Sequence, residues 1–441
     1  MRKILQSIGN IFQVKDLRNK LLITLGIVAL YRLGGHIPIP GVNLHALQAF
    51  FGRSGGAGGI FGLYDLFVGG AFRKAAIFAT GIMPYITASI IFQLLGAVFP
   101  YFQKLQKEGE QGRRKLTQYT RYATLLVAAF QSVGISLYLQ NLDKADPTIV
   151  NLPGVGFNFI AILTFTTGAV LVMWLAEQIT EHGIGNGMSI LIMVGIIARI
   201  PTAFVQEFRL IVAGSRPVFE EIIILAAIVL FTMAAILLTQ GTRQIPVTYP
   251  KRIVGRKMYR GQSVHLPLKI NAAGVIPVIF AQSVMFLPSL LLEVLPQTGF
   301  VMTVQTWFGP THAIYNVIYG ILVVFFAYFY TAVIFNPVDV AENIKKYGGT
   351  IPGRSPGKET SMFIDKVLTR VTLPGAIGLA LLAILPMLMI SYFNFSFFFG
   401  GTSLIIIVGV AIDTLQQIES KLVMRHYDGF LKKGKIRGRR G

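Results

Sequence analysis

The stretch IIILAAIVLFTMAAILL, from Ile222 to Leu238, contains no charged residue and a single hydroxyl side chain. A second stretch, FIAILTFTTGAVLVMW from Phe159 to Trp174, is equally continuous. Neither alternates apolar and polar residues as the strands of a membrane β-barrel do. Each has nearly the length, about 20 residues, that a helix needs to cross a bilayer core about 30 Å thick. These stretches therefore predict membrane-spanning helices and argue against a barrel.

Stretches of this kind recur along the whole chain. Ten spans are predicted, at about 19–37, 73–99, 119–139, 158–176, 184–204, 219–239, 271–292, 314–335, 371–393 and 402–420. Residues 1–205 hold five of them and residues 206–441 the other five, and an odd number reverses the orientation of the second half. The sequence thus predicts an all-α membrane protein of ten transmembrane helices in two inverted five-helix halves. Proline kinks are expected at Pro84, Pro277, Pro288 and Pro386.

The composition combines strong basicity with low charge density. The 441 residues include 40 Lys and Arg against 19 Asp and Glu, so the net charge is +21, yet only 13% of residues are charged. The mean hydropathy is +0.63. Soluble proteins carry about 25% charged residues. A soluble nucleic-acid-binding protein would explain the charge but not the hydropathy, and that class is excluded.

The basic residues are concentrated in a few segments. Residues 1–20, 100–121, 240–270, 336–370 and 421–441 together hold 32 of the 40. With ten spans these segments share one side, which the positive-inside rule makes the cytoplasm, and both termini are expected there. A basic inner face can simply set topology. The two large cytoplasmic loops, at about 240–270 and 336–370, also suggest a docking surface for an anionic partner.

Few residues suggest chemistry. The chain has no cysteine, no phosphate-binding loop and no metal-ligand spacing. No catalytic residue, no cofactor and no metal is therefore expected. Asp413 is the main ionisable residue inside a span, whereas Arg32, Arg73, Lys74 and Arg199 lie near span ends, from which long basic side chains can snorkel to the membrane surface. Spans so poor in charge predict a conduit that is sealed by apolar side chains.

The connection after the first span is rich in glycine. A short apolar segment, residues 60–67, is flanked by the glycines of 52–59 and by Gly69 and Gly70. It is too short to cross the bilayer. Two interpretations stay open: a helix lying on the membrane surface, or a mobile element folded back into a cavity.

Several motifs resemble those of the SecY family, the channel subunits of bacterial protein translocases. They are FATGIMPYITASII (78–91), GEQGRRK (109–115), GIGNG (183–187), QSVHLPLKIN (262–271), FNP (335–337) with AENIKK (341–346), and GGTSL (400–404). They occur in the family's order across nearly the whole chain. The resemblance implies the SecY translocon fold and a channel, not an enzyme. That channel would carry unfolded secretory polypeptides across the plasma (inner) membrane and release transmembrane segments laterally into lipid.

The resemblance also implies a role for particular residues. Pore-ring positions match Ile82, Ile86, Ile90, Met188, Ile192, Ile279 and Ile406. The plug, within residues 55–72, includes Ile60, Phe61, Leu63, Tyr64, Leu66 and Phe67. The second, third, seventh and eighth spans match the lateral gate, with Gln93 and Asn271 as polar contacts across it. Residues that would dock a motor or the ribosome are Arg243, Lys251, Arg252, Arg256, Lys257, Lys345, Lys346, Arg354 and Lys358.

The partners implied by the resemblance are SecE-like and SecG-like small membrane subunits, the motor ATPase SecA, the ribosome, secretory polypeptides with signal sequences, and membrane lipid. Three rival functions can be weighed against the residues. A secondary transporter needs titratable groups at mid-span. An intramembrane protease needs a Ser–His or paired-Asp arrangement. An assembly scaffold would tolerate changes to the pore isoleucines.

Overall fold

The computed structural model describes residues 14–433, except for the short segments 54–59, 146–147, 152–153, 215–216, 250–251, 255–256, 260–262, 296–297, 310–311 and 394–400. For some further residues, among them Ile60, Phe61, Leu63, Leu66, 252–254, 257–259 and 423–433, the structure describes the helix or strand but not the side chain.

Helices dominate both halves of the chain. The first half contains α2 (Lys15–Gly34), α3 (Leu44–Arg53), α4 (Ile60–Phe67), α5 (Met83–Val98), α6 (Pro100–Lys107), α7 (Glu110–Ala145), α8 (Val155–His182), α9 (Gly187–Ile197) and α10 (Ile200–Val212). The helices of the second half are α11 (Val218–Gln240), α12 (Ile276–Val294), α13 (Gly299–Trp307), α14 (Ala313–Ile334), α15 (Pro337–Lys346), α16 (Lys358–Phe393) and α17 (Gly401–Lys433). Each of the ten predicted spans coincides with one or two of these helices.

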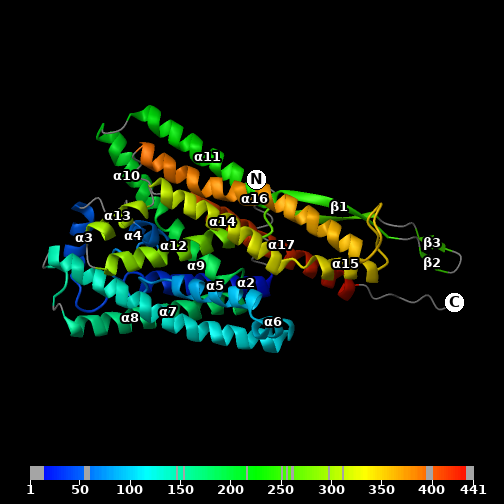
Figure 1. Cartoon of the computed structure of the whole chain (residues 1–441), viewed down its shortest axis with the longest axis horizontal. Helices are drawn as coiled ribbons and strands as arrows, with labels where there is room; N and C mark the ends of the chain where they lie inside the picture. Colours follow the sequence, from blue (N-terminus) through cyan, green and yellow to red (C-terminus); the bar gives the residue numbers. More distant parts are fainter. Residues whose placement is uncertain are drawn as a thin grey trace.

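The helices form an elongated bundle. In Figure 1, α5, α7 and α8 of the first half lie below α11, α14 and α16 of the second, with α12 and α9 between them. The halves meet mainly through α12, which packs on α4, α5 and α7, and through α17, which packs on α9. The helices α3, α4, α10 and α13 gather at one end of the bundle, while β1 and α15 project from the other (Figure 1).

The bundle exposes apolar surface on its outside. Leu230 and Leu237 of α11 are 66% and 71% exposed, and Phe159 of α8 is 69% exposed. In the part of the chain that the structure describes, seven helices are long and apolar enough to cross a membrane, or up to eight if the bent pair α5 and α6 is one span. Apolar surface on this scale fits lipid as its solvent, so the chain is a multi-pass membrane protein.

Two predicted spans have different ends from those expected. The helix expected from residue 73 begins only at Met83, because residues 69–82 form a series of turns in which Gly81 has φ +54°. Pro84 therefore lies in the first turn of α5, where its missing N–H costs nothing, and it does not kink the helix. Pro277 occupies the same place in α12, whereas Pro288 and Pro386 lie inside α12 and α16.

The fifth predicted span is also interrupted. It divides into α9 and α10 at Ala198 and Arg199, and Pro201 lies in the first turn of α10. The residue before a proline disfavours the helical conformation, and proline itself cannot continue an existing helix without losing a hydrogen bond. The break is confined to Ala198 and Arg199, and Gly187–Val212 as a whole is still long and apolar enough to cross a membrane as one span. The sequence therefore predicted this span but not the break within it.

The loop at 240–270 contains strands that the all-α prediction did not include. Strand β1 (Thr242–Thr248) pairs antiparallel with β4 (Ser263–Lys269), and β2 (Arg252–Val254) pairs with β3 (Lys257–Tyr259). Thr248 also pairs with Thr350, whose backbone N–H donates to the Thr248 carbonyl at 2.9 Å. Both large loops therefore belong to one folded element, which we call the loop unit: β1–β4, α15 and the first turns of α16.

The loop unit has a small hydrophobic core of its own. The core consists of Ile245, Val247, Leu268, Ile344, Ile351 and Ile364, all at most 8% exposed. A separate core indicates that the basic side chains on its surface are carried by a defined scaffold.

A close approach of backbones anchors α8 against the turns before α5. A Cβ atom on Gly168 would overlap the carbonyl oxygen of Ile77, whereas a Cβ on Gly156, in the same helix, would meet nothing within 4 Å. We expect Gly168→Ala to lower the free energy of unfolding by about 1–3 kcal/mol, because backbone on both sides must move. Gly156→Ala should be neutral or slightly stabilising. Thermal unfolding of both variants in detergent measures the difference, and equal midpoints would contradict this packing.

Candidate functional site

Two neighbouring cavities lie between the halves of the bundle. The first, which we call the constriction cavity, has a volume of about 80 Å³. Its lining residues come from α5, α9, α12 and α14 and from the turn before α9: Ile86, Ser89, Gln93, Asn186, Met188, Ser189, Ile192, Ile276, Ile279, Phe280 and Tyr330. Aliphatic and aromatic side chains predominate, so the cavity offers few fixed hydrogen bonds to anything inside it.

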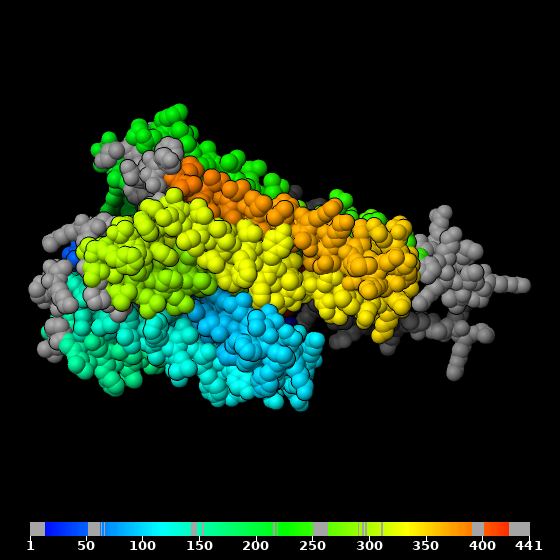
Figure 2. Space-filling model, in the orientation of Figure 1, coloured from blue at the N-terminus to red at the C-terminus, as the bar shows by residue number. Residues whose placement is uncertain are grey.

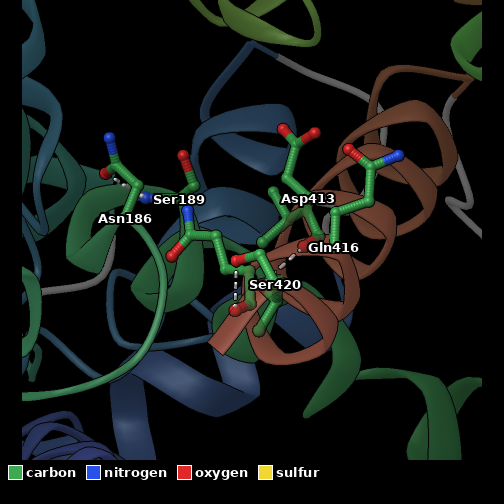
Figure 3. Close-up of a pocket in the computed structure, with 8 residues that line it drawn as sticks. Asn186, Ser189, Asp413, Gln416 and Ser420 are labelled. Atoms are coloured by element: carbon green, nitrogen blue, oxygen red, sulfur yellow. Dashed lines mark hydrogen bonds between the residues drawn. The ribbon is translucent and has the colours of Figure 1, made fainter. Parts of the chain in front are cut away.

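The second cavity, the polar cavity, has a volume of about 390 Å³. It is lined by Asn186, Ser189, Val410, Asp413, Thr414, Gln416, Gln417 and Ser420. In Figure 3, Asn186 and Ser189 lie on one side of it, and Asp413, Gln416 and Ser420 of α17 lie on the other. Asn186 and Ser189 line both cavities, so the polar cavity and the constriction cavity are neighbours.

The polar cavity faces the loop unit. Lys269, the last residue of β4, donates from Nζ to Oε1 of Gln416 at 3.5 Å. The turn at 183–187 closes the other wall: the N–H of Gly185, with φ +82°, donates to Oε1 of Gln417 at 3.1 Å. Asn186 then caps α9 by accepting from the N–H of Met188 at 3.1 Å. The GIGNG segment is thus the turn that leads into α9.

Helix α4 covers the constriction cavity from the side away from the polar cavity. Along α9, Met188 to Ile192 line the cavity, and Gly195, one turn later, touches the C-terminal end of α4: a Cβ on Gly195 would lie 2.7 Å from the Phe67 carbonyl oxygen. Along α12, Phe286 follows the cavity-lining Ile279 by two turns and stacks on Tyr64 of α4 with ring centroids 4.2 Å apart. Since a helical turn rises about 5.4 Å, α4 lies roughly one to two turns beyond the cavity.

Two of the predicted plug residues can be placed in detail. Tyr64 and Phe67 are 1% and 3% exposed, and the Tyr64 hydroxyl donates to the Thr80 carbonyl at 2.7 Å. The side chains of Ile60, Phe61, Leu63 and Leu66 lie outside the described residues, although all four belong to α4. Helix α4 is thus packed inside the protein and is not a helix lying on the surface.

The structure brings part of the predicted pore ring together. Ile86, Met188, Ile192 and Ile279 line the constriction cavity. Ile82, Ile90 and Ile406 are 5%, 3% and 0% exposed and belong to the same hydrophobic core, but they do not line this cavity. Sequence reasoning missed four lining residues, Ser89, Ser189, Phe280 and Tyr330. Helical spacing could have found Ser89, which lies one turn after Ile86, and proximity in the sequence could have found Phe280, which directly follows Ile279.

The two expected gate residues do not bond to each other. Gln93 donates from Nε2 to Ser89 Oγ at 3.2 Å, within α5, and it lines the constriction cavity. Asn271 donates to the Gly274 carbonyl at 3.0 Å. A polar contact between α5 and α12 comes instead from Ser283, whose hydroxyl donates to Met83 Sδ at 3.6 Å. The seam between α5 and α12 is therefore largely apolar. The weak hydrogen bond between Ser283 and Met83 would cost little to break if the two helices separated.

The basic residues of the loop unit are exposed where they are described. Arg243, Lys345, Lys346, Arg354 and Lys358 all face solvent, and the guanidinium of Arg354 lies over the Phe363 ring at 5.3 Å. Lys251 and Arg256 lie outside the described residues, as do the side chains of Arg252 and Lys257 in β2 and β3. The space-filling view shows α15 and the start of α16 at one end of the molecule, in yellow and orange (Figure 2).

Three arginines near the ends of predicted spans have partners within the protein. Asp65 of α4 has a fully buried side chain, and it pairs with Arg73 at 3.2 Å and with Arg199 at 2.7 Å. The guanidinium of Arg32 donates to the Gly69 carbonyl at 3.1 Å. Arg32, Arg73 and Arg199 thus have protein partners, a buried acid and a partly buried carbonyl, which the sequence did not indicate. No group of three or more His, Asp or Glu side chains that could hold a metal occurs in the described ranges.

These features define a class of protein: a polytopic helical membrane protein with a polar entrance and an apolar constriction between its two halves. Residues 76–415 match the sequence model of the SecY family. The chain is 42% identical over 426 residues to the protein translocase subunit SecY of Aquifex aeolicus strain VF5, covering 96% of this chain and 98% of that one. The chain belongs to the SecY family.

Solved structures share the fold at lower identity. One is described as showing that the plug domain of the SecY protein stabilises the closed state of the translocation channel and maintains a membrane seal. It has a TM-score of 0.67 and 17% identity, and the match covers 92% of both chains. Another is Sec61 in the canine ribosome–channel complex from the endoplasmic reticulum, with a TM-score of 0.63, 16% identity and coverage of 92% of this chain and 93% of that one. The chain thus has the fold of protein-conducting channels.

Proposed function

We propose that this chain is the channel-forming subunit through which unfolded secretory polypeptides cross the plasma membrane. The observation that carries the proposal is the pair of neighbouring cavities between the halves, one polar and one apolar, which share Asn186 and Ser189 in their walls. Amide and hydroxyl groups at the entrance suit a hydrated polypeptide backbone. An apolar constriction suits a chain of any sequence, because it selects for no particular hydrogen bond and excludes water when empty.

In this proposal α4 is the plug. The two five-helix halves, residues 1–205 and 206–441, open along the seam between α5 and α12, with α7 and α14 beside it. A transmembrane segment would leave through this seam into lipid. The apolar character of the seam supports this route, since a hydrophobic helix can replace contacts of similar kind. Ile82, Ile90 and Ile406 would join the ring when the halves rearrange.

The energy for translocation would come from outside the chain. We propose that the loop unit docks a motor ATPase resembling SecA, or the ribosome, through its exposed basic residues on the cytoplasmic side, where both termini also lie. A relative of this fold is a channel in a ribosome complex, which supports the second partner. SecE-like and SecG-like small subunits would cover part of the apolar outer surface in the membrane.

Site-specific crosslinking tests the proposed path. A photoreactive residue at Ile86 or Ile279 should crosslink to a secretory chain stalled during translocation, because both side chains line the constriction cavity. The matched control is the same probe at Ile321 of α14, which is 65% exposed on the outside of the bundle. A stalled chain that crosslinks equally at Ile321, or at neither cavity position, would exclude this path.

A further inference from the structure

Asp65 is a buried carboxylate at the junction of three chain segments. Its side chain is 0% exposed. Oδ2 accepts a hydrogen bond from the Arg199 guanidinium at 2.7 Å and lies 3.2 Å from Nε of Arg73, while Oδ1 accepts from the backbone N–H of Arg73 at 3.1 Å. A buried carboxylate needs such partners, since an unpaired charge in this environment is strongly disfavoured.

The two arginines that pair with Asp65 belong to different parts of the chain, one close to α4 and one far from it in the sequence. Arg73 follows α4 closely in the same connection, so its contact with Asp65 can move together with that helix. Arg199 caps α10 at the break after α9, a different part of the bundle. The contact between Asp65 and Arg199 therefore exists only while α4 is seated against α9.

The seat of α4 near this ion pair is closely fitted. A Cβ on Gly69 would lie 2.8 Å from the Gly195 Cα atom, and φ of Gly69 is +71°, so backbone meets backbone here. The Gly69 carbonyl also accepts from the Arg32 guanidinium at 3.1 Å. Polar contacts thus hold one end of α4 to α2 and to the start of α10, close backbone packing holds it to α9, and Tyr64 holds its middle to α12 by ring stacking.

We propose that Asp65 and Arg199 are positioning residues that latch α4 over the constriction cavity and set how often the resting channel opens. The proposal rests on the proposed role of α4 as the plug. When α4 leaves, Arg199 loses its counter-ion in a partly buried place, where its side chain is 24% exposed. This loss disfavours the open state and returns α4 to its seat, independently of the apolar contacts that Tyr64 makes.

Ion conductance of the resting channel tests the latch in the full-length chain with its co-purified subunits. Asp65→Asn and Arg199→Gln should each raise the resting conductance in planar bilayers about tenfold, which corresponds to about 1.4 kcal/mol in the opening equilibrium. The double variant should stay within about twofold of the single variants, because the first substitution already removes the pair. Asp65→Glu keeps the carboxylate, so its resting conductance should stay close to that of the unmodified channel.

The matched control is Glu110→Gln. Glu110 also pairs with an arginine at 2.7 Å, but both side chains are 80% exposed on the surface of α7. Exposed pairs contribute little, so its conductance should be unchanged. Fully additive effects of Asp65→Asn and Arg199→Gln, or an equal effect of Glu110→Gln, would overturn the latch.

A second measurement does not depend on the Asp65 variant folding. The chain has no cysteine, so Tyr64→Cys with Phe286→Cys creates its only pair of thiols, at a contact between α4 and α12. Arg199→Gln should lower the yield of crosslinking by a short bis-thiol reagent at least about threefold, because α4 is seated for less time. An unchanged yield would overturn the proposal.

Deletion of residues 60–67 separates this inference from the proposed function. If the deletion raises resting conductance while Asp65→Asn and Arg199→Gln do not, α4 is a plug without the latch. If the deletion also leaves conductance unchanged, the plug role itself is wrong, and the latch with it.

Discussion

Serine in place of Ile86, Ile192 and Ile279 together is expected to make the resting channel conduct ions. These three side chains come from α5, α9 and α12 and line the constriction cavity. Each exchange removes about 2 kcal/mol of apolar transfer free energy from the constriction and adds a hydroxyl that can hold water. Because about 1.4 kcal/mol is a factor of ten, an increase in conductance of at least about tenfold is a conservative expectation.

The control for this experiment uses isoleucines that face outward. Ile222, Ile321 and Ile377 are 61%, 65% and 45% exposed, on α11, α14 and α16. Their triple exchange to serine makes the same chemical change away from the constriction cavity and should leave conductance at the unmodified level. Single-channel recordings in planar bilayers measure both variants, and thermal unfolding in detergent checks that both fold. If the constriction variant folds and stays sealed, apolar side chains at these positions are not the seal.

Charge reversal on the loop unit is expected to have the second-largest effect, on partner binding. In the variant Lys345→Glu, Lys346→Glu, Arg354→Glu and Lys358→Glu, four exposed cations become anions. An exposed ion pair contributes up to about 1 kcal/mol, so four lost contacts weaken binding of ribosomes or of a motor ATPase on the order of 100-fold. The salt dependence of the remaining binding should also fall, since fewer counterions are released.

The control reverses the same number of charges elsewhere on the predicted cytoplasmic side. Lys104, Lys107, Arg113 and Lys115 are exposed around α6 and the start of α7. Their reversal should weaken binding much less, because they lie outside the loop unit. Co-sedimentation with ribosomes, repeated over a range of salt concentrations, compares the two variants. Equal losses in both would mean that binding follows net charge and that the loop unit is not the docking site.

Hydropathy alone predicts where the spans lie, because lipid requires long apolar helices and tolerates few alternatives. The ends of spans depend on the positions of single glycine and proline residues, which a hydropathy average does not register. Gly81 and Pro84 begin α5 ten residues later than apolar content suggests, and Pro201 starts a new helix in the fifth span. The strands of the loop unit were missed because their pairing, such as Thr248 with Thr350, is between residues far apart in the sequence.

The site could be predicted only in part for the same reason. Family motifs identified Ile86, Met188, Ile192 and Ile279, which meet at one cavity. They did not reveal that Asp65 is buried, since its partner Arg199 lies 134 residues away. A lone acid in a glycine-rich connection and an arginine at the end of a span each have an ordinary explanation, and only their distance in the folded chain connects them.

The constriction cavity is short along the direction of passage. On α9 its lining runs from Met188 to Ile192, on α12 from Ile276 to Phe280, and on α5 from Ile86 to Gln93. Four to seven steps of a helix rise only about 6–10 Å. An extended polypeptide advances about 3.3 Å per residue, so about two or three of its residues would touch these walls at any moment. In the proposed channel, friction would therefore be set by a few side chains at a time and stay nearly constant along a long substrate, so that a docked motor would work against a uniform load.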